Sequence, residues 1–104
     1  MDTLARLEAA IAQREGGDPA ASYVAKLLDK GVPHIARKVG EEAVETAIAA
    51  VAGERGEVVA EAADLVFHLM VLLRSRGIAL ADVLAELDRR EGTSGIAEKA
   101  SRST

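Results

Sequence analysis

Two pairs of acidic residues are spaced three positions apart in stretches that favour helix: Glu42 with Glu45, and Glu61 with Asp64. Residues three apart share one face of a helix, so each pair forms a small acidic patch, and Glu41 adjoins the first. Gathered carboxylates repel one another unless a cation neutralises them. An all-oxygen set favours Mg²⁺, with Mn²⁺ as the alternative, and Mg²⁺ also holds substrate phosphates.

The segment around the second pair is apolar on nearly every side. Residues 58–73 contain Glu61 and Asp64 among Val, Ala, Leu, Phe and Met. A helix that is hydrophobic all round is predicted to be buried. Buried carboxylates are expected to be paired or to bind metal, which favours a site here. The plain alternative is a solvated acidic face, since acidic residues are common on exposed helices.

The two histidines do not fit a carboxylate-bridged iron site. Such sites need Glu-x-x-His pairs on their helices, and neither His34 nor His68 follows a Glu by three positions. His68 comes four residues after Asp64 on the same stripe. We interpret it as a hydrogen-bonded polar residue near the site rather than as a ligand or proton carrier.

A magnesium site on open carboxylates is typical of phosphate-anhydride hydrolysis, in which an activated water attacks phosphorus. A phosphate substrate also needs cations, and Lys38 lies one turn before Glu42. No Walker motif or other glycine-rich phosphate loop is present. The further candidates for contacts with phosphate are Lys26, Lys30, Arg37, Arg74, Arg76 and Lys99.

The periodicity predicts an all-α fold of about five helices, packed as an antiparallel bundle that is completed by oligomerisation. A helical hairpin formed by the third and fourth helices would bring the two acidic pairs to the same height. Asp18 is predicted to cap the second helix, Tyr23 to be buried, and Val44, Ile48 and Val51 to lie on an apolar side of the third. The predicted helices span residues 3–15, 19–30, 33–52, 57–76 and 80–91, followed by a polar, irregular and flexible tail over 93–104.

Length, charge and composition exclude several classes of protein. The 104 residues predict one domain, and the net charge of −4 argues against nucleic-acid binding. The absence of cysteine excludes disulfides and thiol chemistry, and no apolar run reaches the length of a membrane span. We therefore expect a soluble, cytoplasmic protein. Its apolar fourth helix predicts a homodimer or a higher homo-oligomer.

Four segments together resemble a known enzyme family. Lys38–Glu45 and Glu61–Leu69 carry the ExxE and ExxD signature of the all-α nucleoside triphosphate pyrophosphatases. Ser22–Leu28 and Ser94–Arg102 resemble blocks that flank this signature in the phosphoribosyl-ATP pyrophosphatases. The chain is therefore similar to that family along nearly its whole length.

The resemblance implies Mg²⁺-dependent hydrolysis of 1-(5-phosphoribosyl)-ATP to 1-(5-phosphoribosyl)-AMP and pyrophosphate, the second step of histidine biosynthesis. It also implies that a separate cyclohydrolase acts on the product. Glu41 would be a ligand, a water-activating base or the partner of Lys38. The residues that the resemblance makes metal ligands are Glu42, Glu45, Glu61 and Asp64.

Two alternatives to this function remain open. A house-cleaning nucleoside triphosphate pyrophosphatase would share the acidic signature but act on non-canonical triphosphates. A non-enzymatic helical dimerisation module would carry the acids merely as a solvated patch. The choice of substrate distinguishes the house-cleaning enzyme from a phosphoribosyl-ATP pyrophosphatase. The absence of any nucleotide hydrolysis would indicate the dimerisation module.

Overall fold

The computed structural model describes residues 2–92 and 95–102, and over these ranges the chain is helical with no strand, which confirms the all-α class. No helix in the described ranges has the length and apolar character needed to cross a membrane. The helices are α1 (Thr3–Arg14), α2 (Tyr23–Lys30), α3 (Val32–Ala52), α4 (Arg55–Ser75), α5 (Leu80–Arg90) and α6 (Gly95–Arg102).

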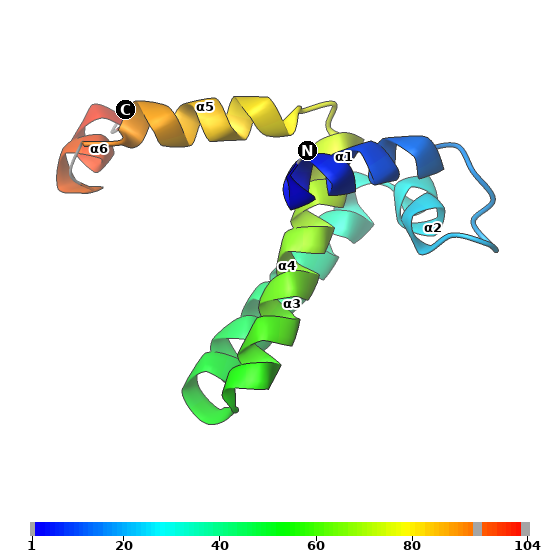
Figure 1. The fold of residues 1–104 in the computed structure, drawn as a ribbon, viewed down its shortest axis with the longest axis horizontal. Coiled ribbons are helices and arrows are strands. Elements are labelled where there is room, and N and C mark those ends of the chain that lie inside the picture. Colours follow the sequence, from blue (N-terminus) through cyan, green and yellow to red (C-terminus); the bar gives the residue numbers. More distant parts are fainter. Residues whose placement is uncertain (1, 93–94, 103–104) are drawn as a thin grey trace.

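The two longest helices, α3 and α4, form an antiparallel hairpin that dominates the fold (Figure 1). The turn between them lies at Gly53 and Glu54. Helices α1 and α2 pack at the opposite end of the hairpin, whereas α5 leads away from it and carries α6 at its far end (Figure 1). The predicted pairing of the two acidic helices is therefore present.

The hydrophobic core is confined to the end of the hairpin where α1 and α2 pack. Ile11, Leu27, Ile35 and Val71, from four different helices, are almost completely buried there. Toward the turn, α3 and α4 are covered by no third helix of the residues that the structure describes (Figure 1). The stability of a single chain therefore depends on one end of the hairpin.

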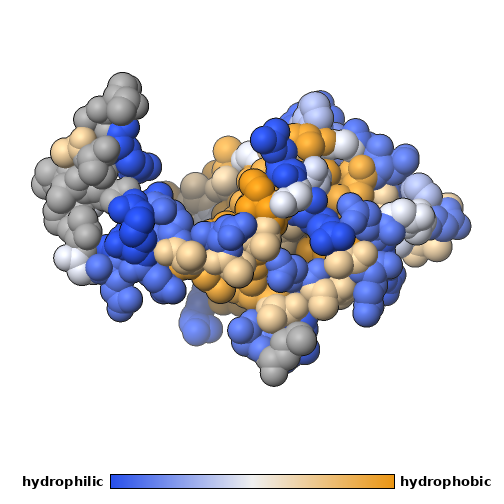
Figure 2. Space-filling model, turned by 90° about the horizontal axis from the view of Figure 1, so that it is seen from above, coloured by the Kyte–Doolittle hydropathy of each residue, from blue (hydrophilic) through white to orange (hydrophobic). Residues whose placement is uncertain are grey.

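The predicted apolar side of α3 is largely exposed toward the turn in a single chain. Val44 and Ile48 are more than half exposed, and Val51 is 89% exposed. On α4, Val59 and Leu69 are also exposed, so this helix is not covered on every side. The physical reason is that no helix of the described residues covers this end of the hairpin. The opposite face, seen from above, also has hydrophobic side chains (orange) between hydrophilic ones (blue) (Figure 2).

The start of α2 also differs from the prediction. The helix begins at Tyr23, where Ser22 Oγ accepts a hydrogen bond from the Ala25 N–H at 3.2 Å. Asp18 instead folds back on its own turn, because its carboxylate accepts from the Ala20 N–H at 2.9 Å. Both residue types cap helices well, so their types alone could not decide between them.

The C-terminal segment contains a helix, α6, where an irregular tail was predicted. The first two residues of the predicted tail, Thr93 and Ser94, lie outside the described residues, as do the last two. Apart from the start of α2, the other observed helix ends agree with the predicted ones to within two residues, the usual uncertainty of such boundaries.

A single glycine makes the corner between α2 and α3. Gly31 has φ 93° and ψ 175°, a conformation open essentially to glycine alone. Its N–H donates to the Leu27 carbonyl at 3.2 Å, and its carbonyl accepts from the Ile35 N–H at 3.1 Å. Gly31 thus ends one helix and begins the next, which places Lys30 beside the start of α3.

Gly31→Ala is expected to lower the free energy of unfolding by about 1–3 kcal/mol, because a Cβ strains this conformation. Gly40→Ala is the matched control: Gly40 lies inside α3 with open space around it, so alanine there should stabilise by about 0.5–1 kcal/mol. Urea unfolding followed by circular dichroism measures both. Equal effects at the two positions would contradict the assigned role of Gly31.

Candidate metal centre

Three of the predicted carboxylates converge between α3 and α4. Glu42 and Glu45 come from α3 and Glu61 from α4, and one oxygen from each lies within 4.8 Å of the others. Their spacing on α3 puts the first two on one face, and the antiparallel packing of the hairpin brings the third opposite them. The role of this acidic trio as metal ligands stays a prediction.

Two buried oxygens of the trio have no hydrogen-bond partner. They are Glu42 Oε2 and Glu61 Oε2, and Glu42 as a whole is only 8% exposed. A buried carboxylate oxygen without a donor is costly, so such atoms call for a cation or a proton. The donor set is oxygen only, which fits a hard divalent cation such as Mg²⁺.

The environment of Glu61 disfavours its charged form. Burial raises the pKa of Glu61, and a hydrogen bond with Glu45 acts in the same direction. The negative charges of Glu45, Asp64 and Glu42 raise this pKa further. The metal-free trio therefore tends to retain a proton, which a bound cation would displace.

The remaining two predicted carboxylates lie at the margin of the trio. Asp64 is exposed and close enough for its charge to act on Glu61, but it is not among the three carboxylates within 4.8 Å. Glu41 is exposed on α3 and pairs with Lys38, whose Nζ lies 3.6 Å from Glu41 Oε1. Of the roles considered for Glu41, this geometry favours that of the partner of Lys38.

His68 connects two parts of the fold: the turn of α4 that contains Asp64, and helix α2. The sequence did not reveal this connection. Its Nδ1 lies 2.8 Å from the Asp64 carbonyl, which can only accept, so Nδ1–H donates. In the neutral ring Nε2 then accepts from the Tyr23 hydroxyl at 2.9 Å. This agrees with the interpretation of His68 as a hydrogen-bonded polar residue.

Tyr23 differs from its predicted place in the core, because half of it is exposed. Its ring stacks on Phe67 with centroids 6.0 Å apart, and its hydroxyl reaches His68. Tyr23 and His68 are 45 positions apart in the sequence, so no local pattern could have revealed their contact.

Among the predicted phosphate-binding cations Lys26, Lys38, Arg74 and Lys99, only Lys38 lies near the trio. Lys26 is exposed on α2, and Lys99 lies on α6, away from the hairpin (Figure 1). Arg74 follows Asp64 by ten residues, which is about 15 Å along α4. Its Nη2 contacts Glu15 Oε1 at 2.7 Å, so the structure does not bring Arg74 to the acidic residues.

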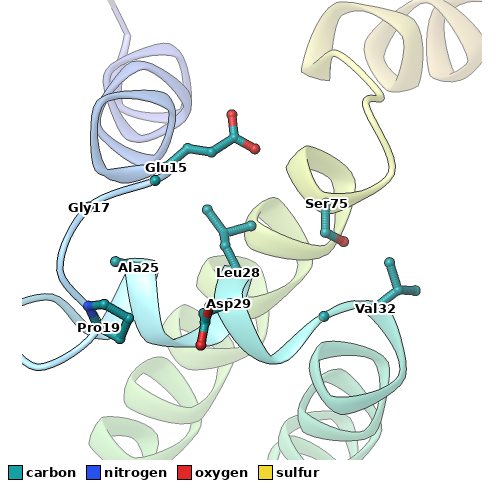
Figure 3. A pocket seen from close by; sticks show the side chains of 10 residues that line it. Glu15, Gly17, Pro19, Ala25, Leu28, Asp29, Val32 and Ser75 are labelled. Atoms are coloured by element: carbon teal, nitrogen blue, oxygen red, sulfur yellow. The ribbon is translucent and has the colours of Figure 1, made fainter.

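A hollow of about 380 Å³ lies at the other end of the hairpin, where α1, α2 and α4 meet (Figure 3). Glu15 and Asp29 are its acidic lining residues, and Glu15 already pairs with Arg74. None of the acidic trio lines it. The hollow is therefore separate from the candidate metal centre.

Comparisons with known proteins show which family the chain is similar to. The family model for phosphoribosyl-ATP pyrophosphohydrolase matches residues 4–91. A curated relative from Novosphingobium aromaticivorans, named phosphoribosyl-ATP pyrophosphatase, is 70% identical over 98% of this chain and 95% of the relative. A relative of the same name from Rhizorhabdus wittichii is 67% identical over 96% of this chain and 94% of the relative. A third, in Erythrobacter litoralis, is 63% identical over 98% of each chain.

The raised pKa of Glu61 predicts a pH-dependent stability of the metal-free protein. Below the ordinary pKa of 4.5 both the folded and the unfolded chain hold the proton; above it only the folded chain does. Stability from this group is therefore lost as the pH rises from 4.5 through the raised folded-state pKa. Thermal unfolding in EDTA should show this decline, and Glu61→Gln should reduce its slope.

Glu57→Gln is the matched control for this experiment, because Glu57 lies on the same helix but outside the trio. It should keep the slope of the unmodified protein. A Glu61→Gln variant with an unchanged slope would contradict the role given to Glu61.

Proposed function

The chain belongs to the phosphoribosyl-ATP pyrophosphohydrolase family, and on that premise we propose that it hydrolyses 1-(5-phosphoribosyl)-ATP to 1-(5-phosphoribosyl)-AMP and pyrophosphate in the cytoplasm, the second step of histidine biosynthesis. One observation carries this proposal. The acidic trio, with two unpartnered buried oxygens, lies on the hairpin of a chain that is 70% identical to a phosphoribosyl-ATP pyrophosphatase.

The carboxylates are the proposed ligands of Mg²⁺, with Mn²⁺ as the alternative ion. When bound, such a cation neutralises phosphate oxygens and promotes ionisation of water. The proposed ligands are Glu42, Glu45, Glu61 and Asp64. The unpartnered oxygens of Glu42 and Glu61 support this set, and Asp64 would join it from the adjoining surface.

Hydrolysis also requires a cation that binds the phosphate oxygens and a base that accepts the proton of the attacking water. Lys38, held by Glu41, lies one turn before Glu42 and would bind phosphate oxygens, stabilising charge that develops on the leaving pyrophosphate. Hydrolysis breaks the anhydride bond between the α and β phosphates as a water oxygen bonds to phosphorus. The water proton passes to a carboxylate base as this bond forms.

We also propose that the protein works as a homo-oligomer. The exposed apolar residues of α3 and α4 support this, since Val51, Ile48 and Val59 are more than half exposed. The radius of gyration is 15.7 Å, larger than the roughly 13 Å expected for a compact chain of this length. In this proposal the product passes to a separate cyclohydrolase.

Pyrophosphate release with Mg²⁺ tests the proposed function. The rate with phosphoribosyl-ATP should far exceed the rates with ATP and dUTP. Equal or faster release from ATP or dUTP would move the protein to the house-cleaning pyrophosphatases. No release from any of these substrates would favour a non-enzymatic helical module.

Glu45→Gln and Asp64→Asn should each lower kcat/KM by at least about a hundredfold, the scale of losing an electrostatic contact with the transition state. Glu57→Gln, outside the trio on α4, should retain full activity. EDTA should abolish activity and Mg²⁺ should restore it. Circular dichroism confirms that the variants fold; near-normal turnover in Glu45→Gln or Asp64→Asn would refute the ligand assignment.

Leu69→Glu tests the oligomer, because this side chain is 41% exposed in the single chain and should fold without strain. A carboxylate buried at a subunit interface without a partner is costly, so the oligomer should dissociate. Light scattering measures the mass, and Arg76→Glu is the control at an exposed polar site. An unchanged mass for Leu69→Glu would place the interface elsewhere.

A further inference from the structure

A basic corner, formed by Lys30, His34, Arg37 and Lys38, lies where α2 meets α3. The positive charges of Lys30, Arg37 and Lys38 all act on the His34 ring. Arg37 Nη2 lies 3.3 Å from His34 Nδ1. The sharp turn at Gly31 is what brings Lys30, the last residue of α2, into this group.

The corner is short of negative charge, although the chain carries a net charge of −4. Two carboxylates lie beside these cations: Glu41, which pairs with Lys38, and Asp29, which precedes Lys30 in α2. Within the described part of the chain, neither Lys30 nor Arg37 forms an ion pair with an acidic residue. An excess of cations over carboxylates favours binding of an anion.

His34 completes the donor set. Arg37 has only N–H groups to offer, so it donates to Nδ1, and the ring must be neutral with its proton on Nε2. Burial, followed by the charges of Lys30, Arg37 and Lys38, lowers the pKa of His34, in agreement with this tautomer. The corner therefore presents an ammonium, a guanidinium and an imidazole N–H, all donors and all suited to phosphate oxygens.

The corner shares one stripe of α3 with the acidic trio. His34, Lys38, Glu41 and Glu45 follow one another at steps of four, three and four residues, which keeps them on one face. His34 precedes Glu45 by eleven residues, about 16 Å along the helix. The three phosphates of a nucleotide are consecutive and would stay near the carboxylates, so a phosphate at the corner must belong to another part of the substrate.

We propose that Lys30, His34 and Arg37 bind the 5-phosphate of the phosphoribosyl group, the anion that distinguishes phosphoribosyl-ATP from ATP. This inference rests on the proposed function. It divides recognition between two parts of the site. The carboxylates and Lys38 hold the reacting triphosphate, and Lys30, His34 and Arg37 hold a phosphate monoester that takes no part in the chemistry. The corner would thereby select the substrate.

Calorimetric binding of the product pair tests the inference without requiring turnover. 1-(5-Phosphoribosyl)-AMP carries the extra 5-phosphate and AMP does not. The unmodified protein should bind the first more tightly, and Lys30→Ala and Arg37→Ala should each weaken that binding by roughly tenfold, the scale of one charge-assisted hydrogen bond. Binding of AMP should stay unchanged, which a merely structural role of these residues would not predict.

Arg55→Ala is the matched control, because Arg55 is exposed at the start of α4, near the turn of the hairpin. It should alter neither affinity. Lys30→Arg should restore most of the preference, since it keeps the charge. Equal losses for both nucleotides, or no loss for either, would overturn the inference. A failure of the proposed function is measured separately: the unmodified protein would then release no pyrophosphate from phosphoribosyl-ATP.

Discussion

Packing of α3 against α4 holds three carboxylates within 4.8 Å of one another, and this enforced approach of like charges is the constraint on which the site depends. The repulsion would separate the two helices if the hairpin were free. It is not, because Ile35 and Val71 are fixed in the core at one end of the hairpin. The raised pKa of Glu61 records the remaining cost, which a proton or a divalent cation relieves.

The surroundings of the trio hold its backbone in place by contacts from other helices. His68 contacts the Asp64 carbonyl and the Tyr23 hydroxyl, and so connects the acidic part of α4 to α2. The corner at Gly31 connects α2 to α3 through a conformation that glycine alone adopts readily. One continuous helix, α3, thus carries basic groups at its start and acidic groups in its middle, an arrangement suited to a long, multiply phosphorylated ligand.

The apolar residues are divided between two tasks. Those at the α1–α2 end of the hairpin form the core of the single chain, whereas Ile48, Val51 and Val59 toward the turn stay exposed. Burying such side chains contributes about 25 cal/mol per Å² of apolar surface, so an uncovered set of this kind favours association of chains. The acidic trio lies between the core and these exposed apolar residues. Covering the exposed residues with a second chain would stiffen the hairpin that carries the trio.

Local pattern by itself predicted α1, α3, α4 and α5 to within two residues and the pairing of α3 with α4, because helical periodicity and residue type are written in neighbouring positions. The ExxE and ExxD spacings and the flanking blocks also indicated the family. Tertiary packing alone decided which carboxylates meet, that Arg74 pairs with Glu15 from 59 positions away, and that Tyr23 reaches His68. Such contacts depend on how whole helices pack against one another. In addition, a single chain leaves some apolar residues of α3 and α4 exposed. That is why the exposure of Val51 and the ion pair of Arg74 with Glu15 could not be read from spacing.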